Sequence, residues 1–163
     1  MDVRRRPTAE DDLDFELALE SQPESALFVG QWSRDEHRDA IARADREHWI
    51  LVEARSRERL GYLIAFDLRA LDCGVYVKRI VADAKGKGVG RQALLGFARH
   101  AFEDLAAPYV WLSVDPENLR GQSCYRAIGF AELVAEADAL ARLDRSVERS
   151  PTNRSLRMVL YPP

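Results

Sequence analysis

The stretch that most limits how this chain can fold is a glycine-rich turn between an apolar run and a helical pattern. The apolar run is VYVKRIVA, residues 75–82, and the turn is followed by VGRQALLGFARH, in which apolar residues recur every three to four positions. This order predicts a strand, a tight turn and a helix. Free backbone N–H groups at a helix start bind anions, and glycines let a phosphate approach the backbone closely. The turn therefore predicts a phosphate-binding site.

The charges around the turn agree with this prediction. Residues 78–91 contain five basic residues and one acid, a local charge of +4 in a chain whose net charge is −3. We expect Lys85, Lys87 and Arg91 to surround the phosphate. The overall negative charge argues against a general nucleic-acid binder, so no nucleic-acid partner is expected. The alternative is an ordinary strand–helix turn with solvated lysines.

Two other phosphate-binding motifs fit less well. A P-loop requires GxxxxGK followed by Ser or Thr, whereas Gly90 is followed here by Arg91 and Gln92. Residues 88–93, GVGRQA, do satisfy the GxGxx(G/A) pattern of dinucleotide-binding folds. However, further residues separate the strand from the first glycine, and too little chain follows the motif for a doubly wound sheet. A nucleotide-binding domain is the less favoured alternative.

The rest of the chain alternates between short strands and helices, and its 163 residues suit a single domain, 1–163. The resulting order, βαα-βββ-α-β-α-ββ, predicts a mixed α/β fold with an antiparallel front half. Residues 138–153 are expected to be a charged connector. Strands are expected in residues 1–7, 48–54, 59–68, 73–82, 109–114, 130–137 and 155–162, and helices in residues 8–21, 33–44, 88–105 and 118–129.

Two segments resemble the sequence motifs of one family. Residues 75–95, VYVKRIVADAKGKGVGRQALL, resemble motif A of the GNAT superfamily of N-acetyltransferases, whose (R/Q)xxGx(G/A) loop binds the pyrophosphate of acetyl-CoA. Gly88 and Gly90 match, and Lys85 replaces the usual Arg or Gln. Residues 112–130, LSVDPENLRGQSCYRAIGF, resemble motif B, N-x-x-A-x-x-x-Y-x-x-x-G-F, with Gly121 in place of alanine. The resemblance covers residues 73–130 and extends to the remainder by pattern only.

The resemblance implies a fold, a donor and a reaction. It implies a central mixed, mostly antiparallel sheet flanked by helices, with two splayed strands forming the acetyl-CoA cleft. The acetyl group would pass from acetyl-CoA to a primary amine by direct attack in a ternary complex. The alternative from another class is a non-catalytic acyl-CoA-binding or sensing module. The residues that the resemblance places at the cofactor are Ile80, Val81, Lys85, Gly86, Lys87, Gly88, Val89, Gly90, Arg91, Asn118 and Tyr125.

Catalytic roles also follow from the resemblance. Tyr125 corresponds to the tyrosine that acts as general acid toward the leaving thiolate, although its place on an apolar helix face also fits a core residue. The general base stays open between Asp72, Asp115 and a water relay, because residues 73–82 contain no carboxylate. A weak base suits an amine of low pKa better than a lysine, whose deprotonation at pH 7 costs about 4–5 kcal/mol.

The acceptor side is expected in the N-terminal third. Trp32 and His37, in FVGQWSRDEH, are similar to a tryptophan and a histidine near the acceptor site of some GNAT members. The acceptor would be a small-molecule amine or a peptide or protein amine. Six acids between Glu10 and Glu20 are expected to form a solvated helix face. His48 and His100 show no metal-like spacing, and neither do the two cysteines, Cys73 and Cys124, so no metal is expected.

The opening residues MDVRRRPTAEDD are charged and do not form a secretory signal. No apolar run approaches the roughly 20 residues that span a bilayer. We therefore expect a cytoplasmic protein without a membrane partner, and we leave a homodimer open.

Overall fold

The computed structural model describes residues 1–68, 72, 74–83, 85–149 and 154–163. Within these residues, the strands form one seven-stranded sheet in the order β1-β2-β3-β4-β5-β7-β6. Every neighbouring pair is antiparallel except β4 and β5, which confirms the expected mixed, mostly antiparallel sheet. The strands are β1 (Val3–Pro7), β2 (Glu47–Glu53), β3 (Arg59–Phe66), β4 (Val75–Ala82), β5 (Val110–Val114), β6 (Ala131–Glu132) and β7 (Leu156–Leu160).

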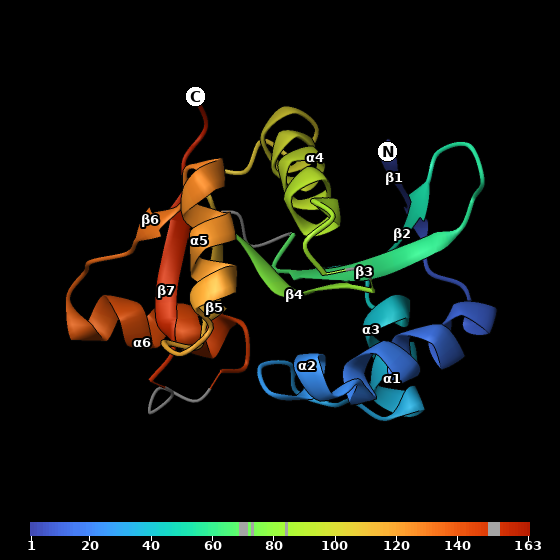
Figure 1. Ribbon diagram of the computed structural model, residues 1–163. Coiled ribbons are helices and arrows are strands. Elements are labelled where there is room, and N and C mark those ends of the chain that lie inside the picture. Colours follow the sequence, from blue (N-terminus) through green and yellow to red (C-terminus); the bar gives the residue numbers. More distant parts are fainter. Residues whose placement is uncertain (69–71, 73, 84, 150–153) are drawn as a thin grey trace.

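Helices cover both faces of the sheet. The first three lie together on one face of β2, β3 and β4, and α4 lies on the opposite face (Figure 1). None of the helices in the described ranges is long and apolar enough to cross a membrane. The helices are α1 (Leu13–Ser21, preceded by a 3-10 turn at Glu10–Asp12), α2 (Pro23–Ala26), α3 (Arg34–Ala42), α4 (Val89–Glu103), α5 (Leu119–Ile128) and α6 (Ala137–Ser146).

The apolar period of α4 creates the main core. Leu94, Phe97 and Ala101 are fully buried on one side of this helix and pack with Leu63 and Leu112 of the sheet. A second core cluster includes Ile50, Tyr62 and Trp111 together with Leu19 of α1. The sheet is therefore apolar on both faces, which explains the near-continuous apolar runs in β3 and β4.

Three helix ends follow from local sequence signals. The Ser33 hydroxyl accepts a hydrogen bond from the Glu36 N–H and starts α3 as a capping box. The Asn118 side chain accepts a hydrogen bond from the Gly121 N–H and caps α5, and Gly129, with a φ of 116°, ends it.

The structure differs from the sequence prediction near the C-terminus. Helix α6 occupies part of the expected connector, and β6 contains two residues where a strand over 130–137 was expected. The helix is held by its Asp144, a fully buried carboxylate that forms ion pairs with Arg149 and Arg157. Because Asp144 places a charged residue on the buried face of α6, the apolar periodicity of the sequence did not predict this helix. The strand expected from residue 73 begins at Val75, and Cys73 itself lies outside the described residues.

The parallel pair at the sheet centre separates along its length. β4 and β5 pair only at Val75–Val110, Tyr76–Trp111 and Val77–Leu112. Beyond this point β4 stays paired with β3 as far as Ala82, and β5 stays paired with β7 as far as Val114. Each strand keeps its outer partner and loses its inner one, so the two expected splayed strands are present.

Candidate active site

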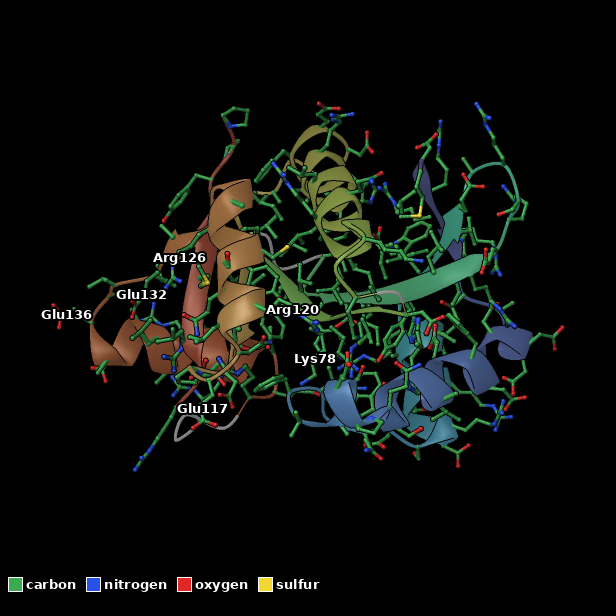
Figure 2. The ribbon with its side chains drawn as sticks, viewed as in Figure 1. Lys78, Glu117, Arg120, Arg126, Glu132 and Glu136 are labelled. Carbon is green, nitrogen blue, oxygen red and sulfur yellow. The ribbon has the colours of Figure 1, made fainter. Side chains whose placement is uncertain are left out.

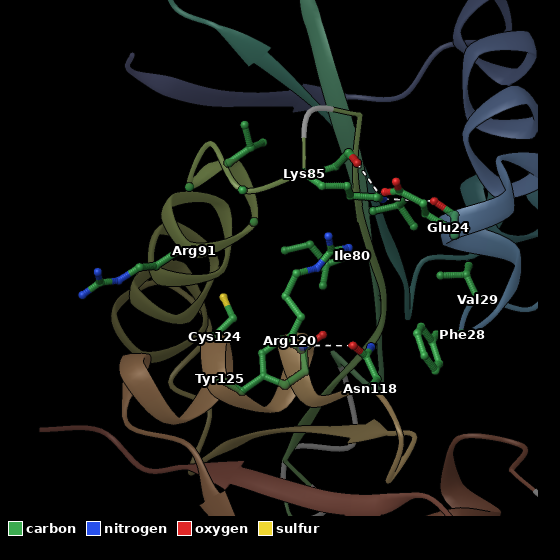
Figure 3. A pocket seen from close by; sticks show the side chains of 18 residues that line it. Glu24, Phe28, Val29, Ile80, Lys85, Arg91, Asn118, Arg120, Cys124 and Tyr125 are labelled. Carbon is green, nitrogen blue, oxygen red and sulfur yellow. Dashed lines mark hydrogen bonds between the residues drawn. The ribbon is translucent and has the colours of Figure 1, made fainter.

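A pocket of about 330 Å³ opens where β4 has separated from β5. Its walls come from β4, the glycine turn, the start of α4, helix α5 and the segment around α2 (Figure 3). It is lined by Glu24, Ser25, Phe28, Val29, Ile80, Val81, Ala82, Lys85, Gly86, Gly88, Val89, Gly90, Arg91, Asn118, Arg120, Gly121, Cys124 and Tyr125. Every residue expected at the cofactor lines this pocket except Lys87.

The glycine turn presents backbone to the pocket. Gly86 and Gly88 have φ values of 80° and 77°, a conformation that favours glycine. Gly88 is the N-cap of α4 and Gly90 lies in its first turn, where N–H groups have no intrahelical partner. A Cβ added at Gly88 or Gly90 would meet no protein atom within 4 Å. The helix start is therefore open to an anion, which its partial positive charge attracts.

The basic residues around the turn have different roles. The Lys85 ammonium donates hydrogen bonds to Ser25 Oγ at 3.0 Å and to the Ala82 carbonyl at 2.7 Å, and so ties the turn to α2. Burial lowers the pKa of Lys85, and the nearby Arg120 lowers it further. The Arg91 side chain points away from the pocket, whereas Arg120 extends into it from α5 (Figure 3). Lys87 is exposed.

Arg120 is a pocket residue that sequence reasoning missed. It lies in the first turn of α5, one helical turn before Cys124, which also lines the pocket. An i, i+4 relation places two residues on one helix face. The motif B segment of the sequence therefore already contained the spacing that places Arg120 at the pocket.

A second pocket, of about 610 Å³, lies on the other side of the gap between the strands. Lys78 and Arg79 of β4, Ser113 and Asp115 of the β5 side, and Arg149 contribute charged and polar groups. Lys78 and Arg120 both lie in the space between β4 and α5, whereas Glu132 and Glu136 lie on the far side of α5 (Figure 2). The two pockets share Phe28, Val29, Ile80, Asn118 and Tyr125.

Tyr125 lies at the junction of the two pockets. Its half-buried ring packs on the main core and contacts the Phe130 ring at 6.1 Å, while the side chain lines both pockets. The two readings of this residue, core and cleft, are thus compatible. Burial raises the pKa of Tyr125 to about 12, so its hydroxyl keeps its proton at neutral pH.

Trp32 and His37 do not line either pocket. The Arg79 guanidinium lies over the Trp32 ring, 4.2 Å from the ring centroid, and the fully buried His37 ring contacts Trp32 edge-on at 5.2 Å. Arg79 in turn donates to Glu20 Oε1 at 2.5 Å. Trp32 therefore packs against Arg79, and Glu20 connects His37 to the same guanidinium. That these two residues bind the acceptor stays a prediction.

The acidic run of α1 also differs from its prediction. Asp12, Glu16 and Glu20 are buried, although a solvated face was expected. Asp12 pairs with Arg6, and Glu20 accepts hydrogen bonds from Tyr62 and Arg79. The basic partners of Asp12 and Glu20 come from other elements and compensate these two charges, whereas Glu16, within the described part of the chain, accepts a hydrogen bond only from Thr8.

Of the two carboxylates considered as general base, Asp115 lies at the second pocket and Asp72 lines neither pocket. Asp115 Oδ1 accepts a hydrogen bond from the Glu117 N–H at 2.8 Å, as a turn residue does. Its carboxylate is nevertheless the nearer candidate to the cleft.

Comparison with known families agrees with this geometry. The family model described as an acetyltransferase (GNAT) domain matches residues 3–131. The chain belongs to the GNAT family of acetyltransferases. It is therefore an acetyl-CoA-dependent acyltransferase, and membership in the family sets aside the nucleotide-binding alternative.

Solved structures share the fold of this GNAT domain. Vibrio cholerae spermidine N-acetyltransferase in complex with CoA and spermine is 17% identical, with a TM-score of 0.76 over 98% of this chain and 95% of that one. The same organism's spermidine/spermine N-acetyltransferase SpeG in complex with manganese ions is 18% identical, with a TM-score of 0.70 over 98% and 92% of the two chains. A chimera of SpeG and hSSAT is 19% identical, with a TM-score of 0.72 over 99% and 96%. No curated protein matches this sequence.

Proposed function

We propose that this GNAT domain transfers the acetyl group of acetyl-CoA to a primary amine by direct attack within a ternary complex. The observation that carries the proposal is the pair of pockets that meet at Tyr125. The first pocket suits acetyl-CoA because it joins a helix N-terminus, for the pyrophosphate, to the unpaired inner edge of β4, for the pantetheine arm. The second pocket lets the amine reach the thioester while the cofactor stays bound.

In the proposed reaction the amine nitrogen attacks the thioester carbonyl and forms a tetrahedral intermediate. The C–S bond then breaks, the amide forms, and CoA leaves as a thiolate. The amine loses its proton to Asp115 or to water held in the second pocket. No step of this reaction requires a metal.

Tyr125 is proposed to stabilise the leaving thiolate through its hydroxyl. Because the tyrosine pKa is about 12 and a thiol has a pKa near ~8.5, complete transfer of the proton costs about 5 kcal/mol. The hydrogen bond to the developing thiolate is therefore the favourable contribution, and the proton that finally reaches sulfur comes from solvent.

The charges of the second pocket favour an acceptor that carries an acidic group beside its amine. Arg149 pairs with Asp144 through Nη1, but its buried Nη2 has no hydrogen-bond partner among the described residues, and the Lys78 ammonium forms no ion pair with any of them. Of the two acids at this pocket, Glu148 is already paired with Arg43 and Arg46, and Asp115 accepts a hydrogen bond from the Glu117 N–H. The two donor groups of this pocket for which the described part of the chain offers no hydrogen-bond or ion-pair partner, Arg149 Nη2 and the Lys78 ammonium, therefore both belong to cationic side chains. Spermine, bound in a similar structure, carries only positive charges, and three cations against two acids line this pocket, so the pocket favours an acidic amine over spermine.

Turnover on matched amines tests both parts of the proposal. Release of CoA thiol should be measured with an amino acid, with the corresponding amide that lacks the carboxylate, and with spermidine. We expect the acidic amine to have the highest kcat/KM, and Lys78→Met to raise its KM while leaving acetyl-CoA affinity unchanged. A preference for spermidine would overturn the acceptor class. Binding of acetyl-CoA without turnover of any amine would favour the sensing module.

A further inference from the structure

Three buried side chains outside the two pockets meet in one small triangle. Glu16 of α1 and His37 of α3 are 0% exposed, and His48 of β2 is 7% exposed. His37 Nδ1 lies 3.0 Å from His48 Nε2 and 3.2 Å from Glu16 Oε2, and His48 Nε2 lies 3.3 Å from Glu16 Oε2. Each of these atoms can be a metal ligand, and each comes from a different element.

The outer contacts determine where the protons are. Thr8 Oγ1 donates its single proton to Glu16 Oε1 at 3.1 Å, so His48 Nδ1, at 2.9 Å from the same oxygen, must be the N–H donor. This leaves a lone pair on His48 Nε2. Burial, followed by the effect of His37, lowers the pKa of His48 to about 3, so the ring stays neutral.

His37, like His48, has its proton on the nitrogen that faces away from the triangle. Its Nε2 lies 3.0 Å from Glu20 Oε1 without an aligned hydrogen bond, and the negative carboxylate favours the proton on that nitrogen. His37 Nδ1 then carries a lone pair. Glu16 Oε2 is buried and receives no hydrogen bond. With Glu16 ionised, three lone pairs therefore face one another, and either a proton on Glu16 or a metal cation between them removes the repulsion.

The size and chemistry of the triangle fit one class of cation. In a tetrahedral zinc site with metal–ligand distances of ~2.0–2.1 Å, neighbouring ligand atoms lie about 3.3 Å apart. The three distances here are 3.0, 3.2 and 3.3 Å. Two imidazoles favour zinc and its neighbours over magnesium or calcium, which prefer oxygen ligands.

The groups that contact the three side chains from outside the triangle are also those expected around a metal site. Imidazole ligands commonly donate their other N–H to a carboxylate or another oxygen, which orients the ring. Thr8 Oγ1 accepts such a hydrogen bond from His48 Nδ1, and Glu20 Oε1 lies 3.0 Å from His37 Nε2 without an aligned hydrogen bond. The charge balance agrees, because Glu16 and Glu20 face one guanidinium, that of Arg79. Burial raises the pKa of Glu16 to about 8, so an ionised Glu16 needs a further positive charge nearby.

We propose that Glu16, His37 and His48 bind a divalent cation of the zinc class, with one position of the tetrahedron left for a solvent molecule. The ion would connect α1, α3 and β2. His37 contacts Glu20, which holds Arg79 at the edge of the second pocket, so the bound ion would stabilise that wall without taking part in acetyl transfer. The sequence expectation of no metal rested on chain spacing, which does not detect ligands supplied by three separate elements.

Metal analysis of untagged protein tests this proposal without any activity assay. We expect about one zinc per chain by elemental analysis after dialysis, a lower melting temperature after removal by a chelator, and recovery on adding zinc. Cobalt(II) added to the stripped protein should give the strong visible absorption of a four-coordinate site. If the stripped protein does not bind zinc by calorimetry and its melting temperature does not change on adding zinc, a proton and not a metal ion lies between the three side chains. The proposal is then wrong.

Variants locate the ion. Glu16→Gln and His48→Gln should weaken zinc binding by at least about 100-fold, and Thr8→Val, which removes only the outer partner, by about 10–100-fold. His100→Gln is the control and should leave zinc binding unchanged. His100 belongs to α4 and contacts Glu47 and Asp104, which are not part of the triangle. Zinc that remains in folded Glu16→Gln and is lost in His100→Gln would place the ion elsewhere and overturn the assignment.

Discussion

Val77 and Leu112 form the last paired residues between β4 and β5, and the two strands separate immediately beyond them. Lys78 and Ser113, the next residues on each strand, already line the second pocket. The cleft therefore opens at the end of the parallel pairing, where the paired residues Tyr76, Val77 and Leu112 also line the second pocket. Each strand remains hydrogen-bonded on its outer side, so the gap needs no disruption of the sheet elsewhere.

Gly90→Ala tests the cofactor site at the helix start. The added Cβ meets no protein atom, and alanine favours a helix over glycine by up to about 1 kcal/mol, so the fold should be retained or stabilised. The methyl group occupies the space where a phosphate would approach, and acetyl-CoA affinity by calorimetry should fall about tenfold or more. Gly96→Ala, in the same helix with only Arg5 nearby, is the matched control. Equal affinities in the two variants would contradict the assignment of the turn.

Arg120→Gln tests the charge that points into the first pocket. Removing it should weaken acetyl-CoA binding and reduce the dependence of affinity on salt, because an ionic contact to the cofactor phosphates is lost. Affinity should be measured by calorimetry at several salt concentrations. Arg126→Gln is the control, since Arg126 is exposed on the same helix and lines neither pocket. An unchanged salt dependence in Arg120→Gln would show that this side chain is merely solvated.

Tyr125→Phe separates a catalytic hydroxyl from a packing ring. The ring keeps its contact with Phe130 and the core, so the melting temperature and acetyl-CoA affinity should stay close to those of wild type. Turnover should fall by roughly 10²–10³-fold, the range for losing one hydrogen-bond donor to a developing negative charge. All three quantities should be measured on one preparation. Full activity in this variant would remove the role proposed for the hydroxyl.

Asp12→Asn tests a buried ion pair through its pH dependence. Arg6 makes two hydrogen bonds to Asp12, at 2.6 and 2.8 Å, and mainly for this reason the pKa of Asp12 lies below its usual value. Stabilisation by an ionised Asp12 is then complete above the unfolded pKa of ~3.9 and is lost as the pH falls through the lower folded pKa.

Chemical denaturation from pH 7 to pH 3 measures this effect. At pH 7 the free energy of unfolding of Asp12→Asn should be about 1–3 kcal/mol lower than that of wild type, and the difference should shrink below about pH 4. Asp39→Asn, at an exposed position of α3, should change it by less than about 0.5 kcal/mol. A difference that stays constant down to pH 3 would mean that packing, and not ionisation, accounts for the loss.

The parts of this protein that the sequence predicted are those decided by neighbouring residues. Gly86 and Gly88 adopt positive φ in the turn, Ser33 and Asn118 cap the helices that follow them, and the period of α4 defines its buried face. Each of these depends on residues a few positions apart, where backbone conformation and hydrogen bonding are local. The two family motifs lie in such segments.

Only the tertiary structure decided which charged residues are buried and what they contact. Glu16, His37 and His48 come from separate elements, and so do Asp144 and its partner Arg157. Taken alone, each resembles a solvated polar residue, because burying a charge is unfavourable until a partner compensates it. That partner is brought near only when the sheet and helices pack, so periodicity within one helix did not reveal the buried cluster beneath Arg79.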